Sequence, residues 1–179
     1  MAESKDKLVY FNLRARAEAT RMLYKVAEKE FVDHRFGSSD EFQNMKPALP
    51  FGQVPILETD HGMLSQSNVI ARYVAKKLGL VGNDLWEEAL HDTVVEASQD
   101  CVNTYAVPNI YSWKVFKSTP APENASELLE AAKNKWVKVL NYVESIATGR
   151  GKKYIIGGYA WACGMLVVCC NAILQSRMS

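Results

Sequence analysis

The sequence predicts a small α/β domain followed by an all-helical domain. Over residues 1–82, short runs of strand-forming residues alternate with runs of helical spacing, in the order β-α-β-α-β-β-α. After the linker "GLVGND", the apolar pattern over residues 83–179 is helical throughout. These two observations place one domain at 1–82 and the other at 83–179.

Four strands are expected in the first domain. The segments 7–11 ("KLVYF") and 31–36 ("FVDHRF") are rich in β-branched and aromatic residues. The segments 54–59 ("VPILET") and 62–65 ("GMLS") flank the turn "DHG", and an Asp-x-Gly turn suits a short hairpin loop. The last two strands should therefore pair with each other.

Three helices are expected in the same domain. The segment 18–29 has apolar residues at helical spacing. A short helix over 38–46 begins with a serine and a glutamate at the spacing of a capping box. The third helix covers 66–79 and is closed by Gly79.

Two further helices are expected in the second domain. Asp84 and Glu87 have the spacing of an N-cap, and an apolar face follows them. This face consists of Leu85, Trp86, Ala89, Leu90, Val94, Ala97 and Cys101. After the loop 118–126, Asn124 and Glu127 cap another helix. Its apolar stripe consists of Leu128, Ala132, Trp136, Val139, Leu140 and Val143.

The segment 154–174 contains no charged residue and is long enough to span a bilayer. Its glycines and Asn171 weaken it as a membrane helix, and a buried core helix explains the same hydrophobicity. We favour the core helix and keep a tail anchor as the alternative.

The composition excludes several classes of partner. The chain is 48% hydrophobic with a net charge of +1, so no general attraction to nucleic acid or to an anionic membrane is expected. The N-terminus lacks the apolar segment of a secretory signal, which predicts a cytoplasmic protein. The four cysteines form no CxxC pair and have no histidine at zinc-ligand spacing, so we expect free thiols.

The segment "LPFGQVPIL", residues 49–57, places a proline at the start of a predicted strand. Pro55 has no N–H to donate to a neighbouring strand. Two interpretations are open: the strand lies at a sheet edge, or the missing N–H and an unusual peptide geometry serve a binding site.

Three segments, "LVYFNLRARAEATR", "LPFGQVPILETDHGMLSQS" and "IARYVAKKLGLVGND", resemble cytosolic glutathione transferases. The resemblance is strongest to the sigma class, which includes the haematopoietic prostaglandin D synthases. It implies a thioredoxin-like first domain and an all-α second domain. In this family the proline matching Pro55 is cis, and the backbone of Val54 would pair with glutathione as if with an added strand.

The resemblance assigns the thiol chemistry to Tyr10 and Arg16. Tyr10 matches the catalytic tyrosine, whose hydroxyl donates a hydrogen bond to the glutathione sulfur, and Arg16 adds positive potential there. Lowering the thiol pKa by about two units takes about 2.7 kcal/mol, much of which a charge-assisted hydrogen bond can supply. Without the resemblance, Tyr10 is a core or rim residue and Arg16 forms an ion pair with Glu18.

The resemblance also assigns the two ends of the tripeptide. The γ-glutamyl carboxylate would bind Ser67, helped by Gln66, because a helix N-terminus favours an anion. The glycyl end would meet Lys46 and Gln53. Phe42 stands where many relatives have tryptophan, and the missing indole N–H predicts weaker glutathione binding.

Asp100 matches the family's acidic residue that reaches the neighbouring subunit's glutathione, which implies a homodimer. Glu96, Gln99 and Asp100 overlie a cluster that binds a divalent ion in the prostaglandin synthases, but Gln99 replaces a carboxylate, so no metal is expected. The alternative for Glu96 and Asp100 is a solvated acidic helix face. The expected glutathione contacts are Phe11, Phe42, Lys46, Gln53, Val54, Pro55, Gln66, Ser67 and Asp100.

The chain departs from the family in two regions. Ala15 replaces a usual glycine, a mild change unless its φ is positive. In "GGYAWACGM", Ala160 and Cys163 replace the Thr and Asp that cap a buried helix, and the chain ends short of the family's last helices. We therefore expect incomplete C-terminal helices, which leaves open whether the second-substrate pocket is complete.

Together these features predict a glutathione transferase that conjugates the glutathione thiolate to small hydrophobic electrophiles, with prostaglandin isomerisation as a special case. A non-catalytic family member, like the lens crystallins of cephalopods, is the alternative. A third hypothesis is a membrane-tethered form held by residues 154–174.

Overall fold

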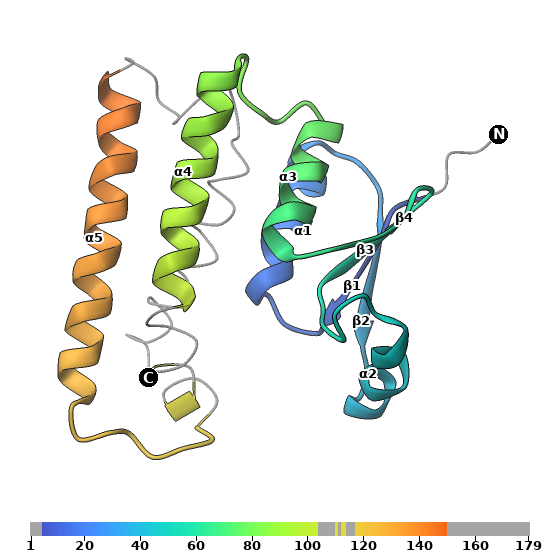
Figure 1. Cartoon of the computed structure of the whole chain (residues 1–179), viewed down its shortest axis with the longest axis horizontal. Coiled ribbons are helices and arrows are strands. Elements are labelled where there is room, and N and C mark those ends of the chain that lie inside the picture. Colours follow the sequence, from blue (N-terminus) through green and yellow to red (C-terminus); the bar gives the residue numbers. More distant parts are fainter. Residues whose placement is uncertain (1–4, 104–109, 111, 114–116, 150–179) are drawn as a thin grey trace. The chain divides into compact units, whose positions relative to one another are not determined.

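The protein is described by a computed structural model (Figure 1) that covers residues 5–103, 110, 112–113 and 117–149. The chain divides into two compact units, Met1–Val81 and Gly82–Ser179, and the division falls inside the "GLVGND" linker. The expectations for residues 154–174, for Ala160 and Cys163, and for the last helices lie outside the described residues.

The first unit is built on a four-stranded mixed sheet. Its strands are β1 (Lys7–Phe11), β2 (Val32–Phe36), β3 (Ile56–Thr59) and β4 (Gly62–Ser65), in the order β2-β1-β3-β4. β1 pairs with β2 in parallel and with β3 antiparallel, and β3 pairs antiparallel with β4. This topology confirms the predicted thioredoxin-like domain and its hairpin.

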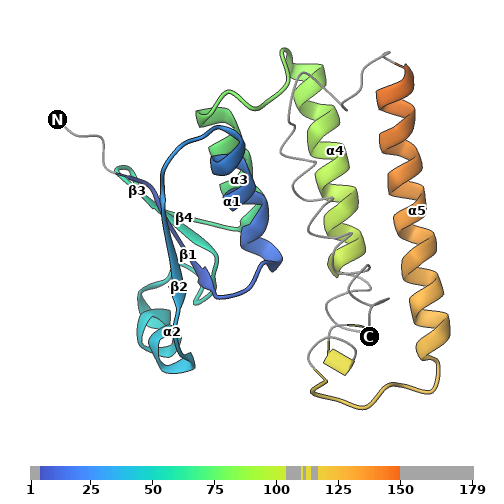
Figure 2. The ribbon, with the colours of Figure 1, turned by 180° about the vertical axis from the view of Figure 1, so that it is seen from behind.

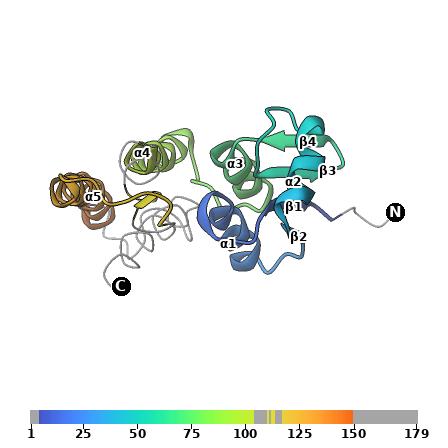
Figure 3. The same ribbon diagram turned by 90° about the horizontal axis from the view of Figure 1, so that it is seen from below.

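Two helices cover one face of this sheet. Figure 3 shows α1 (Glu18–Val26) and α3 (Ser67–Lys77) side by side on that face, and the two helices contact each other. A 3-10 turn, η1 (Ala15–Ala17), leads into α1. The core forms between these layers because apolar side chains of both are removed from water. Its fully buried members include Leu8, Leu57, Ile70 and Val74. Val9 and Ile56 alternate with Leu8 and Leu57 along the strands and form a separate cluster with Phe36 and Leu49.

The short helix α2 (Ser39–Met45) lies beside β2 in Figures 1 and 2 and contacts it. The Ser38 hydroxyl accepts a hydrogen bond of 3.2 Å from the backbone N–H of Glu41, as the capping pattern predicts. The Glu41 carboxylate accepts from the N–H of Gly37, one residue before the position that a capping box uses. A second 3-10 turn, η2 (Lys46–Ala48), follows α2.

Gly79 closes α3 as predicted. Its φ is +69°, in the left-handed region that glycine adopts without a Cβ penalty. The N–H of Leu80 then donates to the carbonyl of Ala75 over 2.8 Å, which satisfies one of the last carbonyls of the helix.

The second unit contains the long helices α4 (Leu85–Cys101) and α5 (Ala125–Gly149), which run antiparallel and contact each other (Figure 1). The Asp84 carboxylate caps α4 by accepting a 2.8 Å hydrogen bond from the N–H of Glu87, as predicted. In α5 the predicted stripe is buried at Ala132, Trp136 and Val139, whereas Leu140 is 40% exposed.

The predicted apolar face of α4 is wrong at its start. Leu85 is 86% exposed and Trp86 is 66% exposed. The buried side consists of Glu87, His91, Val94, Val95, Ser98, Gln99 and Cys101. Polar residues can occupy it because several are satisfied locally. The Glu87 carboxylate accepts from the backbone and side-chain N–H groups of Asn83, and the Ser98 hydroxyl donates to the Val94 carbonyl.

No helix within the described ranges is long and apolar enough to cross a membrane.

Candidate functional site

A cavity of about 470 Å³ opens in the first unit where β1 ends, where the chain enters β3 and where α3 begins. It brings together eight of the residues that the sequence assigned to glutathione or to its thiol: Phe11, Arg16, Phe42, Gln53, Val54, Pro55, Gln66 and Ser67. Phe51, Gly52 and Ser65 also line it and were missed by sequence reasoning. The remaining predicted residues, Tyr10, Lys46 and Asp100, do not line the cavity.

The Val54–Pro55 peptide bond is cis, as the resemblance implied. β3 begins only at Ile56, so the missing N–H of Pro55 removes no hydrogen bond from the sheet. Among the described residues, neither the N–H nor the carbonyl of Val54 makes a backbone hydrogen bond. An unpaired peptide group on a cavity wall can bind an extended peptide through its backbone.

The N-terminus of α3 forms another wall of the cavity. Gln66 precedes the helix with φ 73° and ψ 115°, a conformation that costs a non-glycine residue of order 1–3 kcal/mol. Its side chain does not cap the helix, so the first N–H groups of α3 receive no side-chain acceptor from it. Ser67 is 8% exposed, and the buried hydroxyl of Ser65 has no hydrogen-bond partner within the described part of the chain. These donors suit a carboxylate.

Tyr10 lies behind the cavity wall, 6% exposed, next to Phe11, which does line the cavity. Its hydroxyl accepts a hydrogen bond from the backbone N–H of Arg16. Burial raises the pKa of Tyr10, and the positive charges of Arg16 and Arg21 partly oppose this rise. The phenol therefore stays protonated at neutral pH and is able to donate a hydrogen bond.

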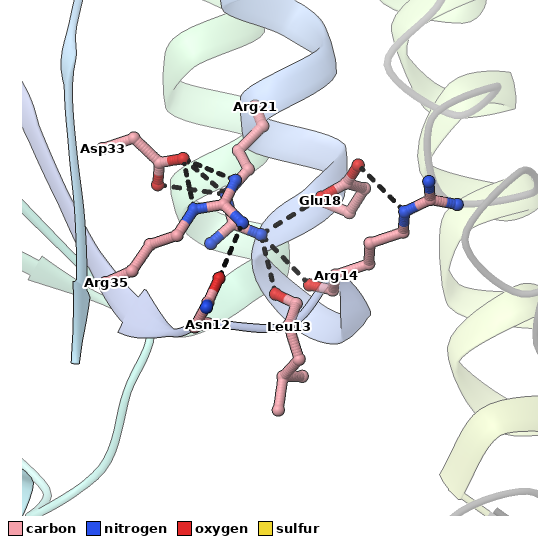
Figure 4. A network of polar contacts seen from close by, with 7 residues as sticks. All are labelled: Asn12, Leu13, Arg14, Glu18, Arg21, Asp33 and Arg35. Carbon is pink, nitrogen blue, oxygen red and sulfur yellow. Dashed lines mark hydrogen bonds and ion pairs between the residues drawn. The ribbon is translucent and has the colours of Figure 1, made fainter. Parts of the chain in front are cut away.

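The loop between Tyr10 and Arg16 is held by a polar network that sequence reasoning missed (Figure 4). The Arg21 guanidinium of α1 donates to both carboxylate oxygens of Asp33 on β2, at 3.0 and 3.2 Å. It also donates to the Leu13 carbonyl at 2.8 Å. The sequence carried no clear signal for this network, because the burial of Ala17 and Arg21 is a property of the folded structure.

Ala15, in the same loop, has φ 33°. This value lies in the left-handed region, where the Cβ of an L-residue approaches its own backbone at a cost of roughly 1–2 kcal/mol. Because this φ is positive, the replacement of the family's usual glycine by Ala15 strains the backbone and is not a mild change.

Lys46 approaches the cavity from behind Gly52. A Cβ on Gly52 would lie 3.5 Å from the Lys46 side chain, and the φ of Gly52 is +60°. The Lys46 ammonium lies 5.9 Å from the centre of the Phe42 ring, which is within cation–π range. Phe42 in turn packs edge-on against Phe11 and Phe36. The aromatic cluster thus holds the ammonium close to the cavity wall.

Asp100 is an exposed residue of α4 and belongs to the second unit. Glu96 is also exposed, and the buried amide of Gln99 donates to the side-chain oxygen of Asn103 over 2.7 Å. Across the described ranges, no group of three or more His, Cys, Asp or Glu residues could hold a metal ion.

Comparison with known proteins identifies the family. The model of the glutathione S-transferase N-terminal domain matches residues 6–76. Glutathione S-transferase 3 of Caenorhabditis elegans is 34% identical over 162 residues, which cover 87% of this chain and 74% of the relative. The chain belongs to the glutathione S-transferase family. Its predicted resemblance and its predicted fold are both confirmed.

Other members of the glutathione S-transferase family match over different lengths. Haematopoietic prostaglandin D synthase of Gallus gallus is 47% identical over 94 residues, which cover 52% of this chain and 47% of that protein. The match thus spans about half the length of this relative. A glutathione S-transferase from the hookworm Necator americanus, described as monomeric, superposes with a TM-score of 0.83 at 30% identity. That match covers 98% of this chain and 83% of the hookworm chain.

Proposed function

We propose that this protein binds glutathione in the cavity of its first unit and conjugates it to small hydrophobic electrophiles as a cytosolic glutathione transferase. One observation carries the proposal. The unpaired peptide group of Val54 and the uncapped N-terminus of α3 line the same cavity as Arg16, whose N–H bonds the Tyr10 hydroxyl. A peptide-binding edge, an anion site and a phenol donor are what an anionic thiol tripeptide requires.

In the proposed complex, the cysteinyl unit pairs with the backbone of Val54 next to Pro55. The γ-glutamyl carboxylate binds Ser67 and Gln66, where backbone N–H groups and the helix dipole favour negative charge. The glycyl carboxylate meets Gln53 and the ammonium of Lys46. Phe11 and Phe42 supply the apolar wall, which excludes water from the thiol and strengthens these polar contacts.

The chemistry begins with ionisation of the glutathione thiol, whose proton passes to solvent water. A free thiol has a pKa of about 8.5 and is only a few per cent ionised at pH 7. The Tyr10 hydroxyl, kept protonated by its raised pKa, donates to the sulfur anion, and Arg16 stabilises the same charge. The thiolate then attacks an electrophilic carbon, a C–S bond forms, and the leaving group departs with its electron pair.

We further propose a homodimer in which Asp100 reaches the partner's glutathione. The exposed position of Asp100 on α4 is compatible with this role. The hookworm relative is described as monomeric, and the mass of the assembly in solution distinguishes the two states. Sedimentation equilibrium should give twice the mass of the chain, and Asp100→Asn should then weaken glutathione binding.

The similarity to a prostaglandin D synthase makes prostaglandin isomerisation a second candidate activity. It requires the same glutathione thiolate together with a pocket for a long apolar substrate. An isomerisation assay on the purified chain, with glutathione present, separates this candidate from general conjugation.

Two assays on the purified full chain test the main proposal. Thermal unfolding should shift upward with millimolar glutathione, by about 2.7 kcal/mol of stability at a hundredfold excess over Kd. The chain should also conjugate 1-chloro-2,4-dinitrobenzene. Ser67→Ala should reduce the thermal shift, whereas Ser39→Ala, at the first position of α2, should keep it. If glutathione shifts nothing, the proposal fails and a non-catalytic family member is favoured.

A further inference from the structure

The loop between Tyr10 and Arg16 has little packing of its own. Asn12, Leu13 and Arg14 are exposed, so few apolar contacts define their position. The N–H of Leu13 donates to the Phe11 carbonyl over 2.7 Å, which is a bond within the loop itself. The position of the loop relative to the sheet therefore depends on polar contacts made by other elements.

Those contacts converge on one carboxylate. Asp33 on β2 accepts from Arg21, and it also accepts from Arg35 at 2.8 and 2.7 Å. Arg35 then donates to the side-chain oxygen of Asn12 over 3.2 Å. Two arginines anchored on the same aspartate thus hold the loop from α1 and from β2 (Figure 4).

Arg21 is the buried member of this pair. Its side chain is 7% exposed, compared with 40% for Arg35. Besides Asp33, its Nη1 donates to the Leu13 carbonyl and to Glu18, at 2.8 and 3.1 Å. Its guanidinium carbon lies 6.0 Å from the centre of the Tyr10 ring. Arg21 thus contacts Asp33 on β2 and the loop, and it lies beside the ring of Tyr10.

We propose that Arg21 is a positioning residue: held by Asp33, its guanidinium fixes the Asn12–Arg14 loop. It thereby sets the position of Arg16, which lines the cavity, and of the Tyr10 hydroxyl behind the cavity wall. The role rests on the proposed function, because the placed groups are those assigned to the thiol. The planar fork is essential to it, since one guanidinium meets a carboxylate and a backbone carbonyl in fixed directions. A lysine keeps the charge but not these directions.

The test compares Arg21→Lys with Lys77→Gln as a matched control. Lys77 also pairs with a buried carboxylate of the first unit, Asp6, at 3.0 Å, but Asp6 precedes β1 whereas Tyr10 lies near its end. Both variants should unfold at a lower temperature than the parent chain. Only Arg21→Lys should lower kcat, by about tenfold or more, since small misplacements of reacting groups cost up to about 100-fold.

The pH profile separates positioning from lost stability. In Arg21→Lys, the apparent pKa of the conjugation rate should rise relative to the parent chain, because the sulfur anion meets a misplaced donor. Lys77→Gln should keep the parent profile. A folded Arg21→Lys protein with unchanged kcat and an unchanged profile overturns the proposal. If Arg21→Lys does not unfold cooperatively, Asp33→Asn replaces it in the test. An unchanged kcat and an unchanged pH profile in folded Asp33→Asn would then overturn the proposal.

A measurement without glutathione distinguishes this inference from the proposed function. The Tyr10 side chain can be observed through its Cζ resonance in carbon-13-labelled protein, assigned by its loss in Tyr10→Phe. The resonance should move in Arg21→Lys and Asp33→Asn and stay in place in Lys77→Gln. A chain without conjugation activity but with this pattern overturns the function and keeps the positioning role. An unmoved resonance in both site variants overturns the positioning role.

Discussion

The backbone N–H of Arg16 donates a hydrogen bond to the hydroxyl of Tyr10, so the loop after β1 folds back onto the strand that it leaves. This contact joins a buried phenol to a residue that lines the cavity. Because the Tyr10 hydroxyl is the acceptor in this bond, its own proton remains available for a hydrogen bond to a bound anion. The first prediction concerns that proton.

Tyr10→Phe should lower the rate of conjugation by about 100-fold, the usual effect of removing one donor to a developing anion. Binding should remain, because the proposed contacts of Val54, Gln66 and Ser67 do not involve the hydroxyl. Steady-state kinetics and the glutathione-induced thermal shift measure the two effects. Tyr73→Phe on α3 is the matched control and should retain the parent rate. Full activity in Tyr10→Phe would contradict the mechanism.

Ala15→Gly should stabilise the protein. At φ 33° the Cβ of Ala15 is strained, and glycine removes this strain, with an expected gain of about 0.5–1 kcal/mol in the free energy of unfolding. Urea denaturation measures the gain. Ala27→Gly is the control, because Ala27 has φ −78° and glycine there only adds disorder to the unfolded chain. Ala15→Gly should raise the free energy of unfolding, and Ala27→Gly should lower it. Destabilisation by both substitutions would show that Ala15 is not strained.

Tyr24→Phe should destabilise the first unit. The Tyr24 hydroxyl donates a 2.6 Å hydrogen bond to the buried Asp6 carboxylate, which Lys77 also contacts. Loss of a hydrogen bond to a charged group costs about 1.5–3 kcal/mol. Thermal unfolding at pH 7 measures this loss.

The same contact predicts the alkaline behaviour. Burial, and then the charge of Asp6, raise the pKa of Tyr24 above its ordinary value of 10.0. Above that pH the unfolded chain releases the proton while the folded chain keeps it. This contribution to stability is therefore complete below pH 10 and is lost as the pH rises further. Tyr24→Phe should flatten the alkaline decline, and an unchanged slope would contradict the assignment.

His91 should make the protein less stable in mild acid. Burial lowers its pKa below 6.5, although Glu87, Asp92 and Glu88 oppose the shift. Below that pH the unfolded chain binds a proton that the folded chain does not. The contribution of neutral His91 to the free energy of unfolding is therefore present above pH 6.5 and is lost as the pH falls. Unfolding midpoints between pH 5 and 8 measure the slope.

His91→Leu should reduce that slope and raise stability at pH 5. Neither ring nitrogen of His91 has a hydrogen-bond partner within the described ranges, and an unsatisfied buried polar group costs about 1–3 kcal/mol. A parent-like slope in His91→Leu would mean that another group titrates.

The local elements of this fold could be predicted because their causes are local. β1 has the predicted bounds, since a continuous run of strand formers suits a central strand that is buried at Leu8, Val9 and Tyr10. The caps by Ser38 and Asp84 depend on residues only three positions apart. Most residues that line the cavity lie in the family motifs, so the sequence could assign them to one site.

The sequence alone was therefore enough for the order of the described elements, for the caps by Ser38 and Asp84, and for the family. The folded structure was needed to establish which face of α4 is buried, because burial depends on what packs against a helix and not on its own hydrophobicity. It also decided the φ of Ala15 and the pairing of Arg21 with Asp33, since both arise where separate elements meet. Periodicity describes one element at a time, and these features belong to the contacts between elements.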